Sequence, residues 1–122
     1  MNTWKEPKNT DKVFWTKHSI EKMKFYNLTP QRVLRVMRRP DRCQEAVAPG
    51  CVACMQTLKN KAQSEIWMMY VPVKDRQQTT NNKQQTIKKK IITAWRYPTV
   101  SPIQDQIPIP NEILEEVERM LK

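Results

Sequence analysis

Glycine is almost absent from this sequence, because Gly50 is the single glycine among 122 residues. Every glycine-rich phosphate-binding loop needs several glycines within a few positions, so nucleotide chemistry of the P-loop kind is excluded. Long apolar runs are absent too: no segment approaches the about 20 residues needed to span a bilayer. The N-terminal stretch MNTWKEPKNTDK lacks the apolar core of a signal peptide. We therefore expect a cytosolic protein without a membrane partner.

Cysteine is also scarce, and its number is odd. Three cysteines cannot all pair within one chain, and reducing compartments keep such thiols free, so Cys43, Cys51 and Cys54 do not suggest a disulfide scaffold. Zinc binding is an alternative, but Cys51 and Cys54 would lie on opposite faces of a regular strand, and no second ligand pair follows. We expect buried, inert thiols, with no metal and no other cofactor.

Positive charge is what the chain has in excess, with a formal net charge of +10. Up to Tyr97 there are 20 basic and 7 acidic residues, a net of +13, and beyond it there are 2 basic and 5 acidic residues, a net of −3. Such a field attracts polyanions, of which RNA or DNA phosphate is the commonest and an anionic membrane surface the weaker alternative. RNA is therefore the expected partner.

Two short amphipathic helices joined by a tight turn are predicted between residues 16 and 39. Thr16 caps the first, and Thr29 followed by Pro30 is a helix start in which the missing proline N–H costs nothing. Arg39-Pro40 ends the second, since a residue before proline is pushed out of the helical region. The apolar positions recur at helical spacing: Ile20, Met23, Val33, Val36 and Met37.

Extended segments follow Pro40. Residues 42–47 and 51–58 form a hairpin around the turn Ala48-Pro49-Gly50, the nearly continuous apolar run 64–73 is a central strand, and 87–97 is the other long strand. The polar stretch 75–86 between them is a loop. The earlier run Val13-Phe14-Trp15 either pairs at a sheet edge or packs beneath the first helix. Alternation in 87–97 places Ile91, Thr93, Trp95 and Tyr97 on one face and Lys88, Lys90, Ile92, Ala94 and Arg96 on the other.

The C-terminal part is acidic and begins with a proline-rich strap, residues 98–110. Asn111 is expected to cap a last helix with the apolar stripe Ile113, Leu114, Val117 and Leu121. This helix docks either in its own domain, which we favour, or on a second copy, so the protein is a monomer or a homodimer. If it shades the phosphate-binding face, removal of residues 99–122 should raise RNA affinity.

The fold class predicted from these elements is α+β. Two N-terminal helices lie on one face of an antiparallel sheet of about four strands, with 64–73 beside 87–97, and a C-terminal helix follows. We divide the chain into an N-terminal arm (1–13), an α+β domain (14–97), and the strap with the acidic helix (98–122).

Two local patterns, Lys17-His18-Ser19-Ile20-x-x-Met23 and Leu28-Thr29-Pro30-Gln31-x-Val33, resemble the RelE-like toxin superfamily and, within it, the BrnT-type ribonuclease toxins and related uncharacterised domains. The resemblance covers about residues 14–97. It implies a metal-independent endoribonuclease fold that is often paired with an antitoxin, and it matches His18, Arg39-Pro40 and Thr93 to family positions. The glycine common between the family's two helices is replaced here by Tyr26-Asn27-Leu28, and residues 98–122 lie outside the family core.

RNA cleavage without metal needs a base, cations for the developing charge on phosphorus, and a proton donor. The candidate catalytic residues are His18, Lys90, Arg96 and Tyr97, to which Arg42 adds a further cation. The candidate nucleic-acid-binding residues are Lys17, Lys24, Arg35, Arg38, Arg39, Arg42 and Lys88. The plainer alternatives are that His18 caps or packs the helix start and that the basic residues form a solvated face.

Trp67 and Trp95 are expected in the core, with base stacking as the alternative. Two functions remain open: an RNA-directed enzyme of the toxin type, or a non-catalytic module that binds RNA or a protein partner through the same basic face. Whether His18, Lys90 and Arg96 converge on one open concavity distinguishes them.

Overall fold

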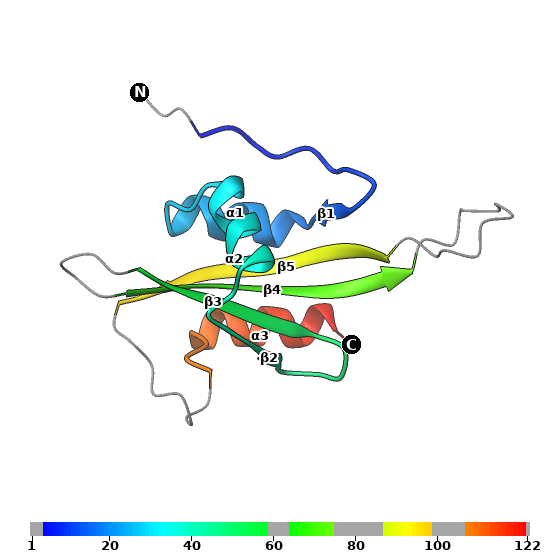
Figure 1. Ribbon diagram of the computed structural model, residues 1–122. Coiled ribbons are helices and arrows are strands. Elements are labelled where there is room, and N and C mark those ends of the chain that lie inside the picture. The colour runs from blue at the N-terminus through cyan, green and yellow to red at the C-terminus, as the bar shows by residue number, and fades with distance from the viewer. Residues whose placement is uncertain (1–3, 59–63, 75–86, 99–106, 122) are drawn as a thin grey trace, which may run out of the picture.

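The computed structural model describes residues 4–58, 64–74, 87–98 and 107–121. The elements in these ranges are β1 (Val13–Trp15), α1 (Lys17–Phe25), α2 (Pro30–Arg38), β2 (Arg42–Glu45), β3 (Val52–Leu58), β4 (Ser64–Lys74), β5 (Ile87–Tyr97) and α3 (Asn111–Met120). Helices α1 and α2 cover one face of the sheet and α3 covers the other (Figure 1). The predicted α+β class is confirmed.

The sheet has five strands in the order β1-β5-β4-β3-β2. The strand over 64–73 is central and pairs antiparallel with β5, as predicted. The expected number of about four strands was one too low, because the run from Val13 to Trp15 joins the sheet edge and pairs parallel with Lys89 to Ile91 of β5. Thr16 fastens this edge, since its hydroxyl donates to Ile91 O at 2.7 Å and its backbone N–H donates to the same oxygen at 3.2 Å.

The two N-terminal helices begin and end where the sequence predicts. The Thr16 side chain accepts from Ser19 N at 3.1 Å, and the Thr29 side chain accepts from Arg32 N at 3.2 Å. Each cap satisfies an amide that has no partner inside its helix. Between the helices Asn27 adopts a left-handed φ of 57°, which asparagine tolerates better than most residues. Asn27 therefore makes the turn that a glycine would otherwise make.

Each face of the sheet has its own apolar cluster. The cluster under α1 and α2 includes Val13, Trp15, Met23, Leu28, Val33, Val36, Met37, Cys54, Ile66, Met68, Ile91 and Ala94. The cluster under α3 includes Cys51, Ala53, Met55, Trp67, Met69, Ile92, Trp95, Ile113 and Val117. Trp67 and Trp95 are 0% exposed and stack with their ring centroids 5.7 Å apart, so their predicted core position is confirmed and base stacking is excluded.

The strict alternation predicted along β5 is wrong at one point. Met69 pairs with Thr93 and Tyr70 pairs with Ile91, so the register skips Ile92. A residue inserted into one strand reverses the facing of everything beyond it. Ile91 therefore lies in the α1/α2 cluster while Trp95 lies in the α3 cluster, although both were expected on the same face.

The C-terminal helix docks in its own domain, as favoured. Ile113 and Val117 are 0% exposed in the α3 cluster, and Leu121 packs against it. The indole N–H of Trp95 donates to Pro108 O at 3.0 Å, which ties the segment before α3 to β5. The predicted cap is wrong, because Pro110 is the N-cap and makes no side-chain hydrogen bond. The sheet separates α3 from α2 (Figure 1). The expectation that α3 shades the phosphate-binding face stays a prediction.

The first strand of the predicted hairpin is shorter than expected, since β2 ends at Glu45 and Val47 turns the chain with a φ of 71°. Loop 75–86 and most of the strap, 99–106, lie outside the described residues. None of the helices in the described ranges combines the length and the apolar character needed to cross a membrane.

Candidate nucleic-acid interface

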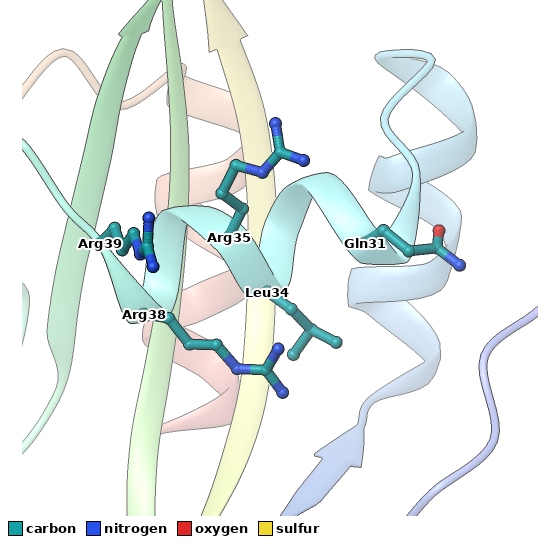
Figure 2. A pocket seen from close by; sticks show the side chains of 5 residues that line it. All are labelled: Gln31, Leu34, Arg35, Arg38 and Arg39. Atoms are coloured by element: carbon teal, nitrogen blue, oxygen red, sulfur yellow. The ribbon is translucent and has the colours of Figure 1, made fainter.

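The exposed side of α2 carries a basic pocket. A pocket of about 400 Å³ is lined by Gln31, Leu34, Arg35, Arg38 and Arg39, which recur at the spacing of one helix face. Figure 2 shows the three guanidinium groups projecting from the helix and its C-terminal end, with the sheet behind. The opposite side of α2 buries Val33, Val36 and Met37, and this burial fixes which way the arginines face.

These guanidinium groups have no acidic partner among the residues that the structure describes. Helix α2 contains no aspartate or glutamate, and the ion pair between His18 and Glu116 lies away from it. The nearest acid in sequence is occupied, because Asp41 Oδ2 accepts from Thr57 N at 2.8 Å. Like charges on one short helix repel one another, so this cluster lowers stability unless an anion neutralises it.

A second pocket, of about 320 Å³, lies beside the first, between the N-terminal arm and α2. The two share Gln31, Leu34 and Arg38, so they adjoin one another. The arm contributes three lysines, one glutamate and several apolar residues to the second pocket. Its further lining comprises Lys5, Glu6, Pro7, Lys8, Thr10, Lys12, Val13, Trp15 and Pro30. We call the two pockets together the arm–α2 groove.

The arm is held in place from both ends of its described part. The indole N–H of Trp4 donates to Leu28 O at 2.8 Å, and Trp4 also packs against the α1/α2 cluster. At the other end, Asn9 Oδ1 accepts from Trp15 N at 2.7 Å. The sequence suggested a loose arm or the approach to a first strand, and these contacts agree with the second reading. Lysines of the arm were not among the predicted site residues; their spacing of three and four before a strand was the only signal.

The predicted nucleic-acid-binding residues are only partly together. Arg35, Arg38 and Arg39 share the pocket on α2, while Lys24 lies over the Trp4 ring at 5.2 Å. Arg42 is on the other side of the sheet, where its guanidinium lies 5.5 Å from the Trp67 ring centroid. Lys17 lines a separate pocket near α3 with His18, and Lys88 lies over Phe14 at 5.9 Å.

The predicted catalytic residues do not converge. Lys90 pairs with Val71, which packs in the α3 cluster, whereas Arg96 pairs with Ile66 of the α1/α2 cluster. Directly paired residues share a face of the sheet, so Lys90 and Arg96 point to opposite sides and lie about 20 Å apart along the strand. Tyr97 pairs with Glu65 and packs on the α3 side. The bulge at Ile92, which the sequence did not signal, is what turns Lys90 and Arg96 to opposite sides of the sheet.

His18 links three elements at the edge of the sheet. Its Nε2 lies 3.0 Å from Thr93 Oγ1, and its Nδ1 is paired with Glu116 of α3. Because a carboxylate only accepts, Nδ1 carries the proton in this pair and Nε2 of the neutral ring accepts from the threonine hydroxyl. Burial lowers the pKa of His18 more than the Glu116 carboxylate raises it. Both ring nitrogens of His18 are thus engaged within the protein, and the side chain is 10% exposed.

The three cysteines are divided between the two faces of the sheet. Cys51 and Cys54 lie in different clusters on opposite faces of the sheet, as the spacing predicts. Within the described ranges there is no group of three or more His, Cys, Asp or Glu side chains that could hold a metal ion. Cys51 and Cys54 are buried and Cys43 is exposed, so the expectation of buried thiols holds for two of the three.

Comparison of the chain with family models, with curated proteins and with solved structures finds no match.

Proposed function

We propose that this protein binds single-stranded RNA along the arm–α2 groove, with Arg35, Arg38 and Arg39 on the phosphates. The observation that carries the proposal is the pocket on α2, which three arginines line without an acidic partner in the described part of the chain. Arginine is the side chain best suited to phosphate, because its planar fork donates two parallel hydrogen bonds.

The shape of the groove favours an unpaired strand over a duplex. Residues three and four apart on a helix lie about 5–6 Å apart, so the three arginines make one compact patch rather than a long track. The neighbouring pocket offers the half-buried apolar side chains Pro7 and Leu34 beside Lys5 and Lys8. Single-stranded RNA exposes base faces for such contacts, whereas a duplex hides them. The resemblance to RelE-like toxins supports RNA over DNA.

The proposal assigns binding without cleavage. A general base needs a free nitrogen within reach of the 2′-hydroxyl, but both ring nitrogens of His18 are occupied. Lys90 and Arg96 point to opposite sides of the sheet, so they do not share one phosphate. A non-catalytic RNA-binding module is therefore the function that these positions support best.

The test measures affinity for a short unstructured RNA by fluorescence anisotropy over a range of salt concentrations. The variant Arg35→Ala/Arg38→Ala/Arg39→Ala should bind about 10² to 10³ times more weakly, because three charged hydrogen bonds are lost. The slope of log K against log salt should fall by about 2, since each phosphate contact on a single strand contributes about 0.7.

The matched control is Lys17→Ala/Lys90→Ala/Arg119→Ala, which removes the same charge from positions outside the groove. It should keep affinity within about threefold, because exposed charges at a distance are screened. Equal losses in the two triple variants would show that diffuse net charge, not the groove, binds RNA. Equal affinity for single-stranded DNA would remove the preference for RNA, and cleavage of the RNA by wild type but not by His18→Ala would restore the enzyme hypothesis.

A further inference from the structure

Two thiols face each other across the last pair of strands. Cys43 of β2 and Cys54 of β3 are direct register partners, and their Sγ atoms lie 2.9 Å apart. Ala46 N donates to Cys51 O, which makes 46 and 51 a hydrogen-bonded pair three steps away along the same ladder. Because the two kinds of pair alternate, Cys43 and Cys54 form a non-hydrogen-bonded pair, in which the Cα atoms lie about 4.5 Å apart.

That geometry is compatible with a disulfide. Disulfides join Cα atoms that are about 4.4 to 6.8 Å apart, and the bond itself is about 2.05 Å long. The two sulfur atoms would have to approach by only about 0.9 Å, which side-chain rotation can supply without moving either strand. Cys51 has no such partner in the described ranges, because it lies in the α3 cluster while Cys54 lies in the α1/α2 cluster.

The two thiols differ in their access to solvent. Cys43 is exposed on the edge strand β2, and Cys54 is 1% exposed beneath α2. Burial raises the pKa of the Cys54 thiol, and the hydrogen bond with Cys43 raises it further. A small disulfide in solution therefore reacts with Cys43 first, and Cys54 is the resolving thiol.

We propose that Cys43 and Cys54 are a dithiol site that forms a reversible intrachain disulfide by exchange with a low-molecular-weight disulfide such as oxidised glutathione. The Cys43 thiolate attacks one sulfur of oxidised glutathione, forms a mixed disulfide and releases one glutathione thiolate. Cys54 then attacks Cys43 Sγ, its proton passes to the departing sulfur, and the second glutathione leaves. The two cysteines are oxidised, and one glutathione disulfide is reduced to two glutathione thiols.

The new bond would fasten the edge strand to the sheet. Strand β2 has four residues and a single neighbour, and it directly follows the C-terminal end of α2. Gln56 of β3 already donates to Arg39 O at 2.9 Å at that junction. A cross-link between residues 43 and 54 restrains a short loop in the unfolded chain, so the oxidised protein should melt about 5 to 10 °C higher than the reduced one.

The test incubates the fully reduced full-length protein with oxidised glutathione and stops the exchange with acid. The remaining thiols are then alkylated in denaturant at neutral pH, and the intact mass is measured. The expected product has lost two hydrogens and carries one alkyl group, on Cys51. Trypsin leaves all three cysteines in one peptide, so a glutamate-specific protease is added to cut after Glu45 and separate Cys43 from the others. The peptide that contains Cys43 should remain linked to the one that contains Cys51 and Cys54 until a reductant is added, and fragmentation of the latter should place the alkyl group on Cys51.

Single variants test the order of the two steps. Cys54→Ser should keep one glutathione on Cys43, because no second thiol displaces it, and Cys43→Ser should take up no glutathione on the buried Cys54. Cys51→Ser is the matched control and should form the disulfide at the wild-type rate. A stable glutathione adduct on wild-type Cys43, a bond that includes Cys51, or three alkylated cysteines after long incubation would each overturn the proposal.

Discussion

The two faces of the sheet differ in charge although both are covered by amphipathic helices. Helix α2 has three arginines and no acid, Arg39 follows as its C-cap, and none of these arginines makes an ion pair within the described ranges. Helix α3 contains four glutamates and one arginine, and its Glu116 is paired with His18. The acidic helix therefore covers the α3 cluster. It does not neutralise the arginines of α2, because the five-stranded sheet lies between the two helices. Opposite charges in one small domain need not be partners.

The largest expected effect tests whether α3 stabilises the fold by burial. Ile113→Ala combined with Val117→Ala should lower the free energy of unfolding by about 4 to 6 kcal/mol, because both side chains are 0% exposed and cavities would remain. Urea denaturation measures it. Glu118→Ala, an exposed position on the same helix, should change stability by less than about 0.5 kcal/mol. Similar small values for both variants would mean that α3 does not dock on the sheet in solution.

The next effect compares two helix caps of the same residue type. Thr16→Val should cost about 2 to 4 kcal/mol, since it removes the cap of α1 and leaves buried carbonyl oxygens of Ile91 and Ile92 without the hydroxyl that now donates to them. Thr29→Val removes only an exposed cap and should cost about 1 kcal/mol. Thermal or urea unfolding measures the loss of unfolding free energy in each variant. Equal losses would contradict the anchoring role of Thr16.

The contact between His18 of α1 and Glu116 of α3 should make the stability of the fold depend on pH. The pKa of His18 is lowered from its usual 6.5, chiefly by burial, so the folded state favours the neutral ring. The contribution of the neutral His18 ring to folding stability is complete above pH 6.5. It is lost as the pH falls from there through the lower pKa of the folded state, because the unfolded chain binds the proton more readily. One group contributes a slope of at most about 1.4 kcal/mol per pH unit.

The measurement is the urea stability of wild type and His18→Gln in steps of pH from neutral to mildly acidic. The variant should show a shallower decline, although other groups titrate in both proteins. Parallel curves, or a wild type that becomes relatively more stable in acid, would contradict the neutral ring and favour a charged pair with Glu116.

The smallest expected effect concerns RNA. Replacing Glu112, Glu115 and Glu118 with glutamine should raise RNA affinity by less than about threefold, because these side chains are exposed on the α3 side, away from the arm–α2 groove. A rise of tenfold or more in the anisotropy titration would show that the acidic helix competes with RNA after all.

Local signals in the sequence predicted the helices well. The two ends of α2 are marked by Thr29-Pro30 and Arg39-Pro40. Both signals are local, because a capping side chain or a proline acts on its own part of the backbone. The central strand was evident from its apolar run. The added strand β1 was left open, since three residues carry too little pattern to separate a sheet edge from a helix support.

The site was harder to predict, because it depends on tertiary placement. Arg35, Arg38 and Arg39 share a helix face, and their clustering follows from helical spacing alone. The bulge at Ile92 was invisible, and it turned Lys90 and Arg96 to opposite sides. The hydrogen bonds of Trp4 and Asn9 help to hold the arm lysines beside the groove, and neither hydrogen bond has a sequence signature.

The anchoring of Thr16 to β5 also bears on how the chain folds during synthesis. The hydroxyl of Thr16 and the carbonyl of Ile91 are 75 positions apart. At about 5 to 20 residues per second, roughly 4 to 15 s pass between the emergence of one and of the other from the ribosome. Until then the apolar stripes of α1 and α2 have no completed sheet to cover, and so this domain folds late, with its N-terminal third exposed to chaperones for most of translation.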